Sequence, residues 1–268
     1  MQLHYKTYGE TGSFLIIVHG LYGSGDNWAT IAKQLSSHYR VVVPDLRNHG
    51  SSPHVDEQSY PAMVGDLLAL MQQLNIQQAH FVGHSMGGKV VMHFALQHPQ
   101  MVDQLFVVDI APKNYYKSSA TGDKNNPHAH ILSVLRQLPL TQCQSREQIE
   151  ALMANDIKEA SVRQFLMKNV KRKPDGNFEW KLNTEALWHH LPALLNGFGN
   201  SQSHMPAYQK PAVFIRGEHS NYIKEDDFFT TRKLFPMAEF VTIPNAGHWV
   251  HSQQPELLVK TIQYFLDV

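Results

Sequence analysis

The organisation of the chain rests on one stretch, AHFVGHSMGG at residues 79–88. A short apolar run, Ala79 to Val82, leads into a turn bounded by glycines, and apolar residues at helical spacing follow from Val90 to Ala95. This order predicts a buried strand, a very tight turn and a helix. The turn matches the pattern G-x-S-x-G, which holds a serine hydroxyl clear of both elements. The stretch therefore predicts that Ser85 is a nucleophile.

The residues around Ser85 have physical reasons to stand where they do. Gly83 and Gly87 carry no side chains that would collide where the strand and the helix pass close together. The backbone amide of Met86, at the start of the helix, is expected to point toward the place where an oxyanion would form. A pattern this short also arises by chance, but its position between a strand and a helix favours the nucleophile.

The length and composition are those of a globular chain. The 268 residues, of which 43% are hydrophobic and 17% charged, suit one large α/β domain or one domain with an insertion. The 23 basic and 23 acidic residues give a formal net charge of zero. The balanced charge predicts no nucleic acid and no membrane surface as partners. A small-molecule substrate is the expected partner, and the expected state is a monomer or a homodimer.

Cysteine and histidine usage give little sign of a metal site. The one cysteine, Cys143, excludes an internal disulfide and a cysteine-built zinc site. The 17 histidines include no H-E-x-x-H motif, so we predict no metal and no cofactor. The N-terminus has no apolar signal region, and no apolar run approaches membrane-spanning length. These observations predict a cytoplasmic protein.

Apolar runs and helical periodicities alternate along most of the chain, which predicts a mostly parallel central sheet flanked by helices on both faces. Strands are predicted at residues 3–8, 14–18, 41–43, 79–82, 105–108, 212–215 and 240–243. Helices are predicted around residues 28–35, at 60–74, directly after Ser85 and at 255–266.

From about residue 113 to residue 209 the pattern changes to helices, with a small hairpin at 170–182. A connection of roughly a hundred residues is too long for a loop. We therefore predict a core formed by residues 1–112 and 210–268 and a helical lid at 113–209. Ligands bind at the carboxyl ends of parallel strands, and we expect the lid to cover that edge.

A serine hydroxyl needs a base to take its proton, and on sheets of this kind an acid and then a histidine follow the serine along the chain. His248 comes directly after the last predicted strand, in a loop at the same sheet edge as Ser85. His251, three residues later, is the lesser candidate. We predict His248 as the base.

The acid that orients the histidine is harder to identify. Its usual place is the loop after the penultimate strand, where Ser220 and Asn221 stand and neither can carry a charge. Asp109 ends the strand expected beside that of the nucleophile, and a carboxylate there can reach the same imidazole. We predict Asp109, with Glu218 as the alternative acid and Asp226 behind it.

Two backbone amides, those of Leu21 and Met86, are predicted to hold the oxyanion. Leu21 follows the first buried strand, and the preceding Gly20 permits a close backbone approach. His19 is expected to brace this loop by hydrogen bonds.

Together these motifs resemble the α/β-hydrolase superfamily over essentially the whole chain. Residues 45–50, with Asn48 where many relatives have glycine, and residues 108–112 and 216–220 resemble more narrowly the YbfF-type esterases. In that branch the acid follows the strand before the lid, which matches Asp109. The resemblance implies a serine hydrolase that cleaves carboxylic esters or thioesters of small to medium acyl groups by a Ser-His-Asp acyl-enzyme mechanism, without a cofactor.

The fold alone does not decide the reaction. The same triad could serve carbon–carbon bond hydrolysis, a lyase step or cofactor-free haloperoxidation, and a catalytically idle fold could bind a ligand under its lid. A strained nucleophile turn offers a pure binder no advantage, so the sequence favours the esterase or thioesterase.

Overall fold

The computed structural model describes residues 1–116, 126–198 and 206–266 of the chain. It contains a seven-stranded sheet in the order β1-β3-β2-β4-β5-β8-β9. At one edge β1 (Tyr5–Tyr8) pairs antiparallel with β3 (Arg40–Pro44), and the other neighbouring strands pair in parallel. The remaining strands are β2 (Phe14–Val18), β4 (Ala79–His84), β5 (Val102–Val108), β8 (Ala212–Gly217) and β9 (Ala238–Ile243). The predicted mostly parallel α/β sheet is confirmed.

Successive residues of β2 explain why the central strands are continuous apolar runs. Ile16 and Val18 belong to one hydrophobic core, whereas Leu15 and Ile17 belong to a second core on the opposite face. Side chains of a strand alternate between its two faces, and both faces are buried here, so every position favours an apolar residue.

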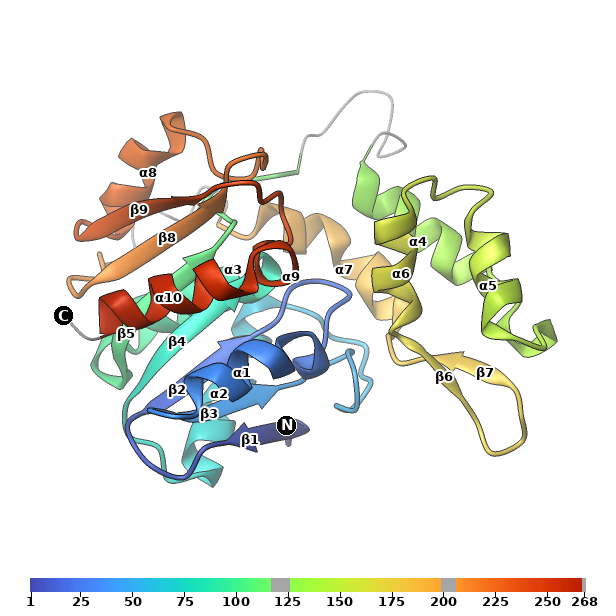
Figure 1. The fold of residues 1–268 in the computed structure, drawn as a ribbon, viewed down its shortest axis with the longest axis horizontal. Helices are drawn as coiled ribbons and strands as arrows, with labels where there is room; N and C mark the ends of the chain where they lie inside the picture. The colour runs from blue at the N-terminus through green and yellow to red at the C-terminus, as the bar shows by residue number, and fades with distance from the viewer. Residues whose placement is uncertain (117–125, 199–205, 267–268) are drawn as a thin grey trace.

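Helices form the two outer layers (Figure 1). The core on one face includes residues of α1 (Ala29–Leu35) and α10 (Pro255–Leu266). The core on the other face includes residues of α2 (Tyr60–Gln73), α3 (Met86–Gln97) and α8 (Asp226–Leu234). Within the described ranges, no helix is both long and apolar enough to cross a bilayer.

Short elements complete the described part of the core. These are η1 (Gly25–Trp28), η2 (Pro99–Met101) and α9 (Val250–Gln253). Neither α8 nor α9 was predicted from the sequence. The four-residue α9 is too short for a periodic pattern, and α8 carries an exposed Phe229 that blurs its apolar face.

Between β5 and β8 the chain forms a helical insertion. Its described elements are α4 (Pro127–Gln137), η4 (Leu140–Gln142), α5 (Arg146–Met153), α6 (Ala160–Met167), β6 (Val170–Arg172), β7 (Phe178–Trp180) and α7 (Thr184–Asn196). The antiparallel pair β6–β7 is the hairpin predicted from the sequence. Figure 1 shows α4, α5, α6 and the hairpin beside the sheet, with α7 nearest to it. The predicted lid, 113–209, includes residues 117–125 and 199–205, which lie outside the described residues, so the lid and its boundaries stay predictions.

Helix α7 is tied to the core at both ends. At its start Asn183 donates its backbone N–H to the Asn48 carbonyl at 3.0 Å and its side-chain amide to Asn48 Oδ1 at 3.1 Å. At its end Tyr60 and Lys89 donate to the carbonyls of Leu194 and Leu195. Asn48 has φ 64°, a conformation that asparagine tolerates better than most residues, so it can replace glycine and still bind the insertion.

Candidate active site

Ser85 lies on a sharp turn between β4 and α3. Its backbone angles, φ 53° and ψ −118°, are rarely populated, and strain of this kind gathers at functional sites. A Cβ added to Gly87 would lie 2.4 Å from the carbonyl oxygens of Val18 and His19, and one added to Gly83 would lie 2.5 Å from the Gly87 carbonyl. Both glycines are therefore required by the close packing of strand and helix, as expected.

The structure brings three predicted site residues into one chain of hydrogen bonds. His248 Nε2 lies 3.1 Å from Ser85 Oγ, and His248 Nδ1 lies 2.7 Å from Asp109 Oδ2. They follow β4, β5 and β9, so each side chain stands at the carboxyl end of a parallel strand. Asp109 is fully buried and Ser85 is 8% exposed.

The other candidates lie elsewhere. The carboxylate of Glu218 is half exposed and accepts the backbone N–H of Asn245 at 2.9 Å. Asp226 is exposed at the start of α8. The ring of His251 is buried and stacks on Trp28, with centroids 4.7 Å apart. The acid that binds His248 is therefore Asp109.

Asp109 is held by the loop after β8, the loop that usually supplies the acid. Its Oδ1 accepts the backbone N–H of Gly217 at 3.1 Å, and its Oδ2 accepts the hydroxyl of Ser220. Sequence reasoning noted that Ser220 stands where a carboxylate was expected but assigned it no role. A hydroxyl at that position was the signal, because it can donate to a carboxylate that comes from the neighbouring strand.

The two predicted oxyanion donors lie beside the nucleophile. Leu21 and Met86 both line the same cavity as Ser85. The first N–H groups of an α-helix have no acceptor within the helix, so the Met86 amide is available to a substrate oxygen. A Cβ on Gly20 would lie 2.8 Å from His84 Nδ1, so the loop needs glycine to approach this closely.

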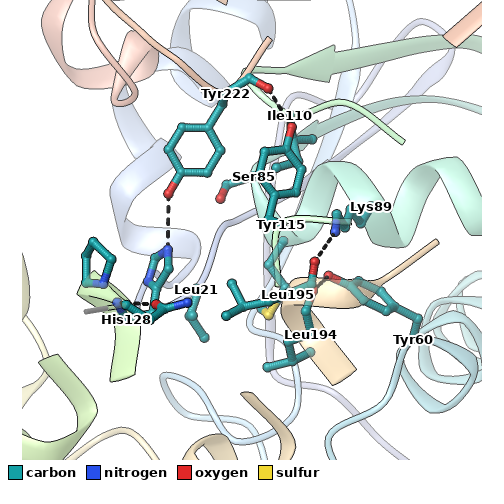
Figure 2. A pocket seen from close by; sticks show the side chains of 13 residues that line it. Leu21, Tyr60, Ser85, Lys89, Ile110, Tyr115, His128, Leu194, Leu195 and Tyr222 are labelled. Carbon is teal, nitrogen blue, oxygen red and sulfur yellow. Dashed lines mark hydrogen bonds between the residues drawn. The ribbon is translucent and has the colours of Figure 1, made fainter. Parts of the chain in front are cut away.

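The cavity in front of Ser85 has a volume of about 160 Å³ and is lined by both the core and the insertion (Figure 2). Its lining residues are Leu21, Tyr60, Ser85, Met86, Lys89, Ile110, Tyr115, Asn126, Pro127, His128, Leu194, Leu195 and Tyr222.

A family model described as alpha/beta hydrolase fold matches residues 14–255. The chain belongs to the α/β-hydrolase family. It is 38% identical over 258 residues to the sn-1-specific diacylglycerol lipase ABHD11 of Danio rerio, covering 94% of this chain and 78% of that protein. It is 34% identical to Esterase YbfF of Escherichia coli, covering 96% of this chain and 94% of that protein.

A solved structure, named Marine microorganism esterase, superposes with a TM-score of 0.92 at 38% identity, covering 98% of this chain and 99% of that one. These relatives confirm the YbfF-like branch and the expected enzyme class, a carboxylic ester hydrolase.

Two tyrosines of this hydrolase near His248 were not predicted: Tyr222 contacts the imidazole, and Tyr115 contacts Tyr222. The ring of Tyr222 stacks on His248 with centroids 3.9 Å apart, and its hydroxyl lies 3.1 Å from His128 Nε2. Tyr115 donates its hydroxyl to the Tyr222 carbonyl at 2.5 Å. The contact between His128 and Tyr222 links α4 of the insertion to the imidazole, a link between distant segments that no local sequence pattern reveals.

Several histidines near the site are buried and neutral. Burial lowers the pKa of His19 to about 4, and it also lowers the pKa of His84 well below its usual value. His19 Nδ1 donates to the Gly20 carbonyl at 2.8 Å while its Nε2 accepts the Leu46 N–H at 2.9 Å, so His19 braces the loop as expected. His84 Nε2 donates to the His248 carbonyl at 2.8 Å and fixes the loop that carries His248.

Two pairs of histidines lie close together in the sequence of the insertion, 128/130 and 189/190. Among the residues that the structure describes, no group of three or more histidine, cysteine or acidic side chains could hold a metal ion. His128 is bonded to Tyr222, and His130 Nε2 lies 3.1 Å from the Asp156 carbonyl.

Proposed function

We propose that this hydrolase cleaves carboxylic esters or thioesters of small to medium acyl groups through an acyl-enzyme formed on Ser85. The observation that carries the proposal is the hydrogen-bond chain from Ser85 Oγ through the His248 imidazole to the buried Asp109. A strained turn that exposes a hydroxyl to a base and a cavity is the arrangement that nucleophilic catalysis needs.

In the first step Ser85 Oγ attacks the ester carbonyl and its proton passes to His248 Nε2. Asp109 keeps the imidazole in the tautomer that can accept this proton, and it stabilises the imidazolium that forms. The amides of Leu21 and Met86 donate to the tetrahedral oxyanion. His248 then gives the proton to the leaving oxygen or sulfur, and water cleaves the acyl-enzyme by the same route.

The size of the cavity favours small acyl groups. Its volume of about 160 Å³ is below the roughly 300–1,000 Å³ of pockets that enclose drug-sized ligands. The relatives include both an esterase and a diacylglycerol lipase, so acyl length is a property that the test should vary.

The test is hydrolysis of p-nitrophenyl esters from acetate to palmitate by the wild type, Ser85→Ala, Asp109→Asn and Glu218→Gln. We expect the wild type to favour the shorter chains. Losing a triad member costs about a thousandfold or more in turnover. The turnover of Ser85→Ala and Asp109→Asn should therefore fall by that factor, while the turnover of Glu218→Gln stays within about twofold of the wild type. Labelling of the wild type by a fluorophosphonate probe, and its loss in Ser85→Ala, identifies the nucleophile independently.

Undiminished turnover in Ser85→Ala would refute the mechanism. Loss of turnover in Glu218→Gln, with turnover retained in Asp109→Asn, would identify the acid as Glu218, in the loop after β8. If the wild type is labelled by the probe but cleaves no ester, the same triad serves another reaction.

A further inference from the structure

A lysine lines the cavity on the other side of Ser85 from Tyr222 and His128, and the mechanism above does not use it (Figure 2). Lys89 lies on α3 one helical turn after Ser85, lines the same cavity and is only 2% exposed. A buried lysine is rare unless an acidic group pairs with it, because removing the ammonium from water is costly.

Protein groups satisfy only part of this ammonium. Its Nζ donates to the Leu195 carbonyl at 2.9 Å and lies 4.8 Å from the centre of the Tyr115 ring. An ammonium has three N–H donors, and over the described ranges no carboxylate lies within salt-bridge distance of Lys89. The neighbouring Lys113 differs, since its Nζ is paired with Asp227 at 2.6 Å.

The nearby carbonyls already have other donors. The Leu195 oxygen also accepts the backbone N–H of Tyr115 at 2.9 Å, and the Leu194 oxygen accepts the hydroxyl of Tyr60 at 2.8 Å. Among the described residues, these two carbonyls are therefore each shared or already occupied by another donor. Burial, with a smaller contribution from the neighbouring Lys113, lowers the pKa of Lys89 to about 7.

The geometry relates the lysine to the acyl side of the substrate. Figure 2 shows Tyr222 and His128 on one side of Ser85 and Lys89 and Tyr60 on the other. Tyr222 stacks on His248, the group that must protonate the leaving atom. The leaving group therefore belongs on the Tyr222 side, and the acyl chain extends toward Lys89.

Building on the proposed function, we infer that Lys89 binds a carboxylate at the far end of the acyl group. The preferred substrates are then monoesters or monothioesters of short dicarboxylic acids. Lys89 follows Ser85 by four positions, a rise of about 6 Å along the helix axis, and the cavity of about 160 Å³ restricts the acid to a short chain.

The test compares monoethyl esters of succinic, glutaric and adipic acid with ethyl butyrate, pentanoate and hexanoate, with products measured by chromatography. The measured quantity is the ratio of kcat/KM for the charged ester to that for the neutral ester of equal length. A charge-assisted hydrogen bond lost with Lys89→Met should lower this ratio about ten- to a hundredfold. Lys89→Arg keeps the charge and should retain part of the ratio. Lys113→Met removes a lysine that is already paired and should leave the ratio within about threefold.

The pH dependence in the wild type gives a readout that needs no variant. The groups that face Lys89 are Lys113, which is paired, Tyr60 and Tyr115, whose pKa values are raised by burial, and His93, whose pKa burial lowers to about 4. Tyr60, Tyr115 and His93 therefore do not change charge between about pH 6 and 9. The ratio should therefore fall as the pH rises through this range and Lys89 loses its proton.

A ratio that is unchanged in Lys89→Met, or a wild type with no preference for the charged esters at pH 6, would overturn the inference while leaving the esterase proposal intact. If Lys89→Met does not fold, Lys89→Gln, which keeps an N–H donor but no charge, replaces it, and an unchanged ratio in that variant overturns the inference equally. No turnover of the neutral esters, including p-nitrophenyl butyrate, would instead count against the proposed function.

Discussion

Removing the hydroxyl of Ser220 tests how the buried acid is held. Asp109 Oδ2 accepts both this hydroxyl and His248 Nδ1, and Oδ1 accepts the Gly217 N–H, so Ser220→Ala removes one of three donors from a fully buried carboxylate. The backbone N–H of Tyr222 also loses its acceptor, Ser220 Oγ, at 3.2 Å. Hydrogen bonds to charged groups contribute about 1.5–3 kcal/mol each, so the free energy of unfolding should fall by that amount.

The same loss should lower kcat/KM for p-nitrophenyl butyrate about tenfold, because the carboxylate is less firmly oriented toward His248. Urea unfolding measures the first effect and initial rates the second. Ser220→Thr keeps the hydroxyl and is the matched control. In an Asp109→Asn background Ser220→Ala should cost much less, since the two residues act through one hydrogen bond. Equal rates and equal stability for Ser220→Ala and the wild type would refute this account of the acid.

Three further predictions concern the fold. Gly87→Ala should lower the free energy of unfolding by about 1–3 kcal/mol or more, because the added Cβ would lie 2.4 Å from two carbonyl oxygens. Gly65 in α2 is the control: a Cβ there meets nothing within 4 Å, so Gly65→Ala should raise the free energy of unfolding by about 0.5–1 kcal/mol. Thermal unfolding measures both effects. Asn48→Gly keeps the positive φ but loses the side-chain bonds to the insertion and to the Val55 N–H, so urea unfolding should show a loss of about 1–3 kcal/mol. Acid should destabilise the protein as the pH falls from about 6.5 toward 4, because the histidines bind protons in the unfolded state but stay neutral when buried in the folded state. The free energy of unfolding should fall by up to about 2 kcal/mol for each histidine at pH 5. Urea midpoints that are equal at pH 7 and 5 would contradict this. The histidines concerned, whose pKa values burial lowers to about 3 or 4, are His19, His49, His93, His128 and His251.

The sheet was predictable because burial on both faces leaves a strong local signal. The run at 14–18 coincides with β2, and the predicted helix at 255–266 coincides with α10. Strand ends were less accurate: β5 begins at Val102 rather than Leu105, because Asp103 and Gln104 interrupt the apolar run. These two polar residues are only half-buried at the start of the strand, so they interrupt the apolar pattern of the sequence without disrupting the hydrogen bonds between strands.

The proximity of Ser85 and His248 could be predicted because motif, chain order and sheet edge agree. Asp109 required an argument about which strands are neighbours, and the pairing of β4 with β5 supplies it. The contacts of Ser220 and Lys89 could not be predicted. Each joins residues more than a hundred positions apart, Ser220 with Asp109 and Lys89 with Leu195. Sequence patterns of a few residues contain no information on such contacts.

The carboxylate that binds the imidazole follows β5, while the loop after β8, its usual source, supplies a hydroxyl, and this has a consequence for how such enzymes are detected. Here the carboxylate comes from Asp109 and the hydroxyl from Ser220, and the two meet at one oxygen. A search that demands an acidic residue in the loop after β8 would select Glu218, whose carboxylate accepts the Asn245 N–H and is not bonded to the imidazole. A search that asks which side chains meet at the imidazole would find the set complete. In this chain the strand beside β8 supplies the carboxylate, so its location in space identifies it where its place in the sequence does not.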